Sequence, residues 1–148
     1  VVSSEFLGPF VFSQVRRKPR IRSSLKQVYR NREAITDELI EMIHTPASKP
    51  TAQKVFASIV TAPPGPKPTD LLPNIQQPLL VLWGENDPWT PIQGADVYRQ
   101  LADDPEQSNP VTFHSIPDTG HCPHDERPEI VNPLILDWLK DLQSHGRR

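Results

Sequence analysis

The longest apolar run in the chain is Leu79 to Trp83, which is closed by Gly84 and by the turn-forming sequence Asn86-Asp87-Pro88. Such a run with an abrupt stop is typical of a strand that is buried on both faces of a parallel sheet. A second strand-like run covers residues 111–116. Apolar residues recur at helical spacing from Pro91 to about Ala102, so residues 79–116 are predicted to form a strand, helix and strand crossover.

The chain before this unit has the pattern of short amphipathic helices. Three helical segments are predicted between Ser23 and Val60, with Ser23 or Ser24 capping the first. The second ends at His44-Thr45-Pro46, and the third begins at Thr51 and stops at the proline-rich stretch 62–66. The third has an apolar side made of Val55, Phe56, Ile59 and Val60.

Two further helix signals follow the central strand. Thr90, Pro91 and Gln93 have the form of a capping box, with Thr90 as the cap. The last helix carries one apolar stripe from Ile130 to Leu142. Its interior Pro133 removes a backbone hydrogen bond and costs about 3 kcal/mol, so we expect a kink there or a helix that begins only after Asn132.

Composition narrows the class of protein. The 148 residues include 18 prolines, which implies many short connections, and the net charge of −2 gives no general attraction to nucleic acid or anionic membranes. No apolar run approaches the roughly 18 residues that span a bilayer, and no signal peptide is visible. The single Cys122 excludes an intramolecular disulfide and fits a reducing, intracellular compartment. The start without Met favours a piece of a longer protein.

One local charge bias stands out. The segment from Arg16 to Arg32 contains eight Lys or Arg residues and no acid. It could bind nucleic acid or an acidic partner, but aromatic residues are nearly absent from it, and a solvated face explains it better. No nucleic-acid partner is therefore predicted.

The candidate chemistry lies in the loops that follow the two predicted strands. Asp87 stands just beyond the carboxyl end of the first strand, where parallel sheets place functional groups, although Asn86-Asp87-Pro88 alone could be a simple turn. The second strand is followed by Gly120 and His121, and Gly120 would allow a tight turn that presents the imidazole ring. Trp89 either lines a pocket or packs the loop against neighbouring helices.

These segments resemble the α/β-hydrolase family. Residues 82–89 (Leu-Trp-Gly-Glu-Asn-Asp-Pro-Trp) and 120–129 (Gly-His-Cys-Pro-His-Asp-Glu-Arg-Pro-Glu) are similar to the branch of plant and cyanobacterial pheophytinase-like hydrolases. The resemblance implies an α/β fold in which residues 1–70 are a helical cap and 71–148 are the C-terminal part of the core. It also implies that Asp87 is the acid and His121 the base of a catalytic triad.

By the same resemblance the substrate is a small hydrophobic carboxylic ester, possible locations include the chloroplast, and no cofactor is needed. The elbow motif G-x-S-x-G is absent from the sequence, so the nucleophile and the oxyanion hole are expected outside these residues and the 148-residue chain alone is expected to be inactive. Two alternatives stay open: an enzyme of the epoxide hydrolase or dehalogenase type, with an Asp nucleophile, and a truncated, non-catalytic interaction protein.

Other nucleophile and metal assignments are less well supported. The residues His121, Cys122, His124 and Asp125 contain metal-ligand types, but they lie too close together to converge without a helix, and no second cluster completes a tetrahedral site. No metal site is therefore predicted. Cys122 is not predicted to be a nucleophile, because His121 already has Asp87 as its partner.

Overall fold

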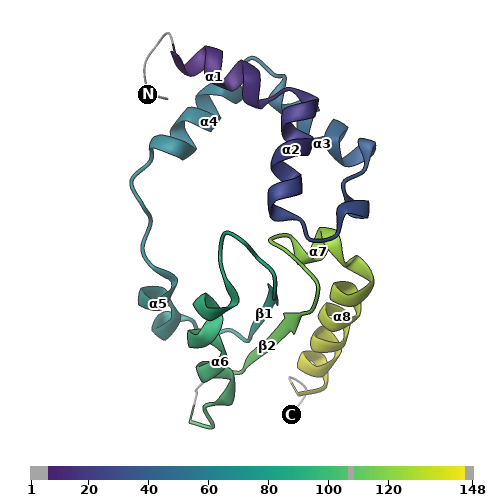
Figure 1. Ribbon diagram of the computed structural model, residues 1–148. Helices are drawn as coiled ribbons and strands as arrows, with labels where there is room; N and C mark the ends of the chain where they lie inside the picture. The colour runs from purple at the N-terminus through teal and green to yellow at the C-terminus, as the bar shows by residue number, and fades with distance from the viewer. Residues whose placement is uncertain (1–6, 107–108, 146–148) are drawn as a thin grey trace. The chain divides into compact units, whose positions relative to one another are not determined.

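The computed structural model describes residues 7–106 and 109–145, and its elements are labelled in Figure 1. The contacts within the chain define two compact units. The first unit consists of the residues up to Gln27 together with Ile35–Pro66, and the second consists of Val28–Ala34 together with the residues from Lys67 onward. The short segment Val28–Ala34, which interrupts the first unit in the sequence, therefore folds as part of the second.

The first unit is helical. Its helices are α1 (Leu7–Val15), α2 (Lys18–Val28, of which Val28 belongs to the second unit), α3 (Asp37–Ala47) and α4 (Ala52–Thr61). Helix α1 packs on α4, where the ring centroids of Phe12 and Phe56 lie 5.3 Å apart. The rest of the predicted apolar side of α4 stays open, because Val55, Ile59 and Val60 are more than half exposed.

Two predicted helix boundaries in this unit are wrong. Ser23 and Ser24 do not cap a helix but lie inside α2, which begins at Lys18 and buries Ile21 and Val28 one above the other on one face. Helix α3 extends one residue past the predicted end at His44-Thr45-Pro46, because it includes Pro46 and ends at Ala47. A proline in the last turn removes only its own backbone hydrogen bond, so the helix can continue for one more residue.

Part of the basic segment is paired within the helical unit. Lys18 forms an ion pair with Glu41, and Arg22 forms one with Asp37 while also donating to the backbone oxygen of Ile35 at 2.9 Å. Both ion pairs are exposed, so each contributes little to stability. The expectation that this segment is a solvated face, and not a binding surface, stays a prediction.

The second unit contains the predicted crossover. Strand β1 (Leu79–Gly84) pairs in parallel with β2 (Val111–Ile116), with Leu79 opposite Val111 and Gly84 opposite Ile116. The connection between them includes the 3-10 helix η3 (Ile92–Ala95) and helix α6 (Asp96–Asp103). The unit also contains η1 (Arg32–Ala34), α5 (Pro68–Leu71), η2 (Leu72–Asn74), α7 (Pro123–Glu126) and α8 (Pro128–His145).

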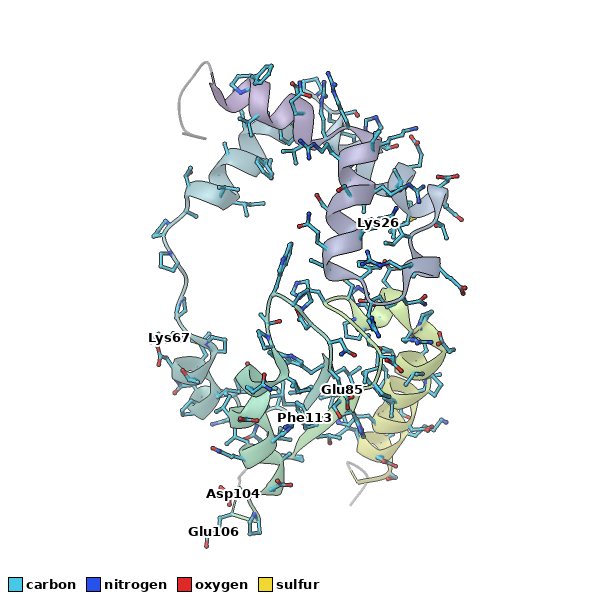
Figure 2. The ribbon with its side chains drawn as sticks, in the orientation of Figure 1. Lys26, Lys67, Glu85, Asp104, Glu106 and Phe113 are labelled. Carbon is cyan, nitrogen blue, oxygen red and sulfur yellow. The ribbon has the colours of Figure 1, made fainter. Side chains whose placement is uncertain are left out.

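Helices cover both faces of the two-stranded sheet. Phe113, labelled in Figure 2, faces α6, because the guanidinium carbon of Arg99 lies 5.0 Å from its ring centroid. The alternate residues Thr112 and His114 face α8, where they line a groove together with Trp138. Since successive side chains of a strand point to opposite faces, α6 and α8 lie on opposite sides of the sheet, as Figure 1 also shows.

The strand and the last helix differ from the prediction in detail. The side chains of β1 from Leu79 to Trp83 are only partly buried, not buried on both faces, because β1 has β2 as its one strand neighbour among the described residues. Helix α8 begins at Pro128 and contains Pro133, so it does not start after Asn132. Val131 is its most buried side chain, with 1% of its surface exposed.

The predicted capping box does not form. The turn after β1 leads into η3, and Pro91 precedes that 3-10 helix with extended backbone angles. The hydroxyl of Thr90 donates to Asp87 instead of accepting a backbone hydrogen bond from the helix. The charged carboxylate of Asp87 is a stronger hydrogen-bond partner for the Thr90 hydroxyl than a backbone N–H group. The side chain therefore points toward Asp87 and not toward the end of the helix.

Candidate active site

Asp87 lies in the loop that leaves the carboxyl end of β1, two residues after Glu85, which is labelled in Figure 2. Only 8% of Asp87 is exposed. Its Oδ1 accepts the backbone N–H groups of Trp89 at 2.8 Å and Thr90 at 3.0 Å, and its Oδ2 accepts the Thr90 hydroxyl. The loop therefore folds around the carboxylate and fixes its orientation.

The electrostatics of this loop favour the ionised form of Asp87. Burial by itself raises the pKa of the carboxyl, because it disfavours the charge. The hydrogen bonds from Thr90, His121 and the Trp89 N–H outweigh that effect and hold the pKa of Asp87 below its usual value. Asp87 is thus a carboxylate at neutral pH, as a residue that orients an imidazole must be.

His121 is held in the loop that follows β2. In this loop Thr119 is fully buried, and its backbone oxygen accepts the N–H of Asn86 from the acid loop at 2.9 Å. The backbone N–H of His121 donates to the oxygen of Val28 at 3.0 Å. The loop is therefore tied both to the acid loop and to the segment Val28–Ala34.

The glycines of the site serve close approach and not a left-handed turn. A Cβ at Gly84 would lie 2.0 Å from the backbone oxygen of Gly120, and a Cβ at Gly120 would lie 2.1 Å from the oxygen of Val28. The left-handed residue of the histidine loop is Asp118, with φ of 49°, a conformation that Asp tolerates. The proposed reason for Gly120, a tight turn, is therefore replaced by the lack of space for a side chain.

The structure brings the two predicted site residues together. The Nδ1 atom of His121 lies 2.8 Å from the Oδ2 atom of Asp87, although 34 positions separate the residues in the sequence. Since a carboxylate only accepts hydrogen bonds, this contact places a proton on Nδ1, and in the neutral imidazole Nε2 then has the free lone pair. His121 also borders a small hollow of about 180 Å³ that is lined by residues of both loops.

Trp89 stands beside the imidazole. The centroids of the Trp89 and His121 rings are 5.0 Å apart and the ring planes are inclined by 59°. The indole side remains open, because 64% of Trp89 is exposed. An exposed aromatic surface next to the imidazole suits a hydrophobic ligand, and the predicted role of Trp89 in substrate binding stays a prediction.

Sequence reasoning did not assign the supporting roles of Thr90 and Glu126. Thr90 was predicted as a helix cap, but its position three residues after a carboxylate also permits the contact with Asp87. Glu126 is 1% exposed and accepts backbone N–H groups from two separate parts of the second unit. Its position on a four-residue helix gives no periodic signal of burial.

Cys122 is poorly suited to act as a nucleophile. Burial raises the pKa of the Cys122 thiol, and the charges of Glu126, Asp125 and Asp87 raise it further, although a hydrogen bond with Tyr29 opposes them. The thiol is therefore a weak nucleophile at neutral pH. In the part of the chain that the structure describes, no three His, Cys, Asp or Glu side chains gather as a metal site.

Two further histidines, His44 and His114, contact groups that are not part of the candidate site. His44, in the last turn of α3, lies with Nδ1 2.8 Å from the backbone oxygen of Arg16 and with Nε2 3.2 Å from the Ser48 hydroxyl. His114 lines the groove between β2 and α8.

Within residues 7–106 and 109–145, no helix is both long enough and apolar enough to cross a bilayer.

Comparison with known proteins identifies the class. Residues 3–134 match the model of the alpha/beta hydrolase family, so the chain belongs to that family. It is 31% identical over 141 residues to "Pheophytinase, chloroplastic" from Arabidopsis thaliana, an alignment that covers 92% of this chain and 28% of the relative. It is 25% identical over 123 residues to "Uncharacterized hydrolase YugF" from Bacillus subtilis (strain 168), which covers 83% of this chain and 43% of that protein.

The chain thus spans less than half of the length of either curated relative. No solved structure matches it significantly. The parallel strands and crossover helix of the second unit agree with a part of the alpha/beta hydrolase fold, which confirms the predicted fold class.

Proposed function

We propose that Asp87 and His121 are the acid and the base of a hydrolytic triad and that the complete enzyme hydrolyses a carboxylic ester. The nucleophile of this triad is a serine supplied by sequence outside these 148 residues. The family and its hydrolase relatives support hydrolysis as the type of reaction. The assignment of the two residues rests on the contact between them.

The observation that carries the proposal is the 2.8 Å contact between Nδ1 of His121 and the buried Oδ2 of Asp87. With Nδ1 engaged, Nε2 takes the proton of the serine hydroxyl as the serine oxygen attacks the ester carbonyl carbon. The imidazolium then gives that proton to the departing alcohol as the ester C–O bond breaks. In the second half the same nitrogen takes a proton from water as the water oxygen attacks the acyl carbon, and it returns this proton to the serine oxygen as the acyl-enzyme bond breaks. Asp87 stays ionised throughout.

The proposed substrate is a hydrophobic ester. The exposed face of Trp89 beside His121 offers an apolar contact close to the reacting atoms. The name of the Arabidopsis relative points to pheophytin, so a chlorophyll-derived ester is the first substrate to test, and a chloroplast location goes with it. These two assignments rest on the Arabidopsis relative, whereas the hydrolase class rests on the family.

The test uses the longest product of the gene that encodes residues 1–148. We expect a fluorophosphonate probe to label one serine outside these residues and to abolish hydrolysis of a long-chain p-nitrophenyl ester. Mass spectrometry of the labelled peptide locates the serine. His121→Gln should prevent both labelling and turnover while leaving the unfolding midpoint nearly unchanged.

Two results would overturn the proposal. A product that opens epoxides and ignores the probe has an Asp nucleophile and belongs to the alternative enzyme class. A labelled serine within residues 1–148 would contradict the location of the nucleophile. Hydrolysis of pheophytin, compared with that of the simple ester, then decides the substrate separately from the triad.

A further inference from the structure

Glu126 is a buried carboxylate that the proposed reaction does not use. Only 1% of it is exposed, and four backbone N–H groups converge on its two oxygens. Oε2 accepts from Arg30 at 2.7 Å, Asn31 at 2.9 Å and Gly120 at 3.0 Å, and Oε1 accepts from Cys122 at 3.3 Å. An ionised carboxylate, which has only acceptors, matches this set of donors.

Two of these donors flank the proposed catalytic base. Gly120 and Cys122 are the neighbours of His121 on either side, so Glu126 holds the backbone both before and after the imidazole. The other two donors belong to the segment Val28–Ala34, which also receives the His121 N–H at the oxygen of Val28. Glu126 therefore joins the two stretches of chain between which His121 is bound.

Two further hydrogen bonds join the same two stretches of chain. The side-chain amide of Asn31 donates to the backbone oxygen of Glu126 at 2.9 Å, and the Tyr29 hydroxyl donates to Asp125. There is no room for a side chain in place of Gly120, since a Cβ there would lie 2.1 Å from the backbone oxygen of Val28 and 2.9 Å from the backbone nitrogen of Arg30. The loop is thus fixed by contacts on each side, and a small displacement of Glu126 would be passed to the His121 backbone.

We propose that Glu126 is a positioning residue that sets the orientation of the His121 ring toward Asp87 by clamping the histidine loop to the segment Val28–Ala34. The catalytic meaning of this role rests on the proposed function, but the role itself is a structural one. A buried carboxylate without hydrogen bonds is strongly destabilising, so the four donors and the carboxylate must be kept together. Glu126 touches no reacting atom and acts only through His121.

The decisive variant is Glu126→Gln, with Glu129→Gln as the matched control. Glutamine has the size of glutamate, but it lacks the charge, and with its oxygen in the Oε2 position its NH₂ group faces the N–H of Cys122. Glu129 lies three residues later, and 61% of its side chain is exposed. The two variants therefore remove the same charge from a buried site and from an open one.

Amide hydrogen exchange of the complete enzyme measures how firmly Glu126 holds the histidine loop. The informative group is the His121 N–H, because it donates to Val28 and not to Glu126. We expect its protection to fall at least about tenfold in Glu126→Gln, while the amides of α6 keep theirs. In parallel, the ¹⁵N shifts of the imidazole should change from a single Nδ1-protonated tautomer to a mixture. Glu129→Gln should leave both signals as in the wild type.

Unchanged protection of His121 and an unchanged tautomer in Glu126→Gln would overturn the proposal. Glu126→Asp keeps the charge but has a shorter side chain. If the Gln variant does not fold, the Asp variant is measured in its place. The expected result is again a loss at His121 with an unchanged unfolding midpoint. If both variants lose the whole fold, Glu126 is a general stabilising residue and the specific role is wrong.

The result is separable from the proposed function. Neither readout requires turnover, so a negative outcome leaves the roles of Asp87 and His121 intact. Conversely, full ester hydrolysis by an Asp87→Asn enzyme would remove the triad and would not change the exchange data. A positive result adds one expectation for the complete enzyme: Glu126→Gln lowers kcat more than it raises KM, whereas Glu129→Gln changes neither.

Discussion

The acid loop and the histidine loop are built in different ways. Asp87 takes most of its support from its own loop, since three of its hydrogen bonds come from residues two and three positions later. The histidine loop depends on distant chain: His121 donates to Val28, and Glu126 binds Arg30 and Asn31, about 95 positions away. A local support forms wherever the loop forms, whereas a distant one requires the segment Val28–Ala34 to be in place.

This difference predicts where the site is robust. The acid loop should keep its geometry when the segment Val28–Ala34 is perturbed, and the histidine loop should not. The two loops meet at Gly84 and Gly120, and across the contact between Asp87 and His121. Substitutions at the junction, at the local support and at the rim of the site can therefore separate these contributions.

The largest effect is expected for Asp87→Asn, which breaks the link between the loops. An amide can donate to Nδ1, so it favours the tautomer in which Nε2 carries the proton and cannot accept another. We expect kcat of the complete enzyme to fall by about 10³ to 10⁴. Steady-state hydrolysis of a p-nitrophenyl ester gives the value.

A matched control for this variant is Asp118→Asn. Asp118 is exposed and has a positive φ, which Asn accepts equally well. We expect its kcat to stay within about twofold of the wild type. Equal losses in the two variants would mean that loop charge in general, and not the contact with His121, determines the rate.

The next effect concerns the contact of the two backbones. In Gly84→Ala the new Cβ would lie 2.0 Å from the backbone oxygen of Gly120 and 2.6 Å from that of Thr119, so one loop has to move. We expect a loss of about 3 kcal/mol in the free energy of unfolding, measured with urea. Gly94→Ala is the control: its Cβ would meet only the Trp83 ring at 4.0 Å, and it should change stability by less than about 1 kcal/mol.

The same contrast explains what could be predicted from the sequence. Leu79 to Trp83, with the turn after it, defines a strand and an acid loop through neighbouring residues, and the family resemblance paired Asp87 with His121. The predicted helix caps at Ser23 and Thr90 do not form. Ser23 lies inside α2, and the Thr90 hydroxyl donates to the carboxylate of Asp87, so other contacts outweigh local propensity at both positions. Glu126 could not be predicted, since its partners lie far away in the chain and backbone donors carry no sequence signal.

A smaller effect is expected when the local support of the acid loop is weakened. Thr90→Val removes the hydroxyl that donates to Asp87 and keeps the shape of the side chain. One lost hydrogen bond to a charged group should cost about 1 to 2 kcal/mol in the free energy of unfolding. It should also raise the pKa of Asp87 toward its usual value, because that hydroxyl is one of the groups that lower it.

The lowered pKa of Asp87 determines how its contribution to stability changes with pH. Because the folded pKa of Asp87 lies below that of the unfolded chain, about 3.9, the ionised carboxylate adds stability above that pH. The contribution is lost as the pH falls through the folded pKa, and in Thr90→Val this loss should be complete at a higher pH, because the folded pKa of Asp87 is higher. A ¹³C titration of the carboxyl group measures it, with Thr90→Ser as the variant that keeps the hydroxyl. An unshifted titration in Thr90→Val would show that the backbone donors alone hold the charge.

The smallest effect on stability is expected at Trp89, an exposed residue beside His121. With 64% of its surface exposed, the indole contributes little to folding, so Trp89→Ala should change the free energy of unfolding by less than about 0.5 kcal/mol. If the ring binds the hydrophobic part of the substrate, KM for a long-chain ester should rise about fivefold, since aromatic contacts contribute about 1 kcal/mol. Trp89→Phe should recover much of this. An unchanged KM together with a stability loss above about 1 kcal/mol would instead make Trp89 a packing residue of the acid loop.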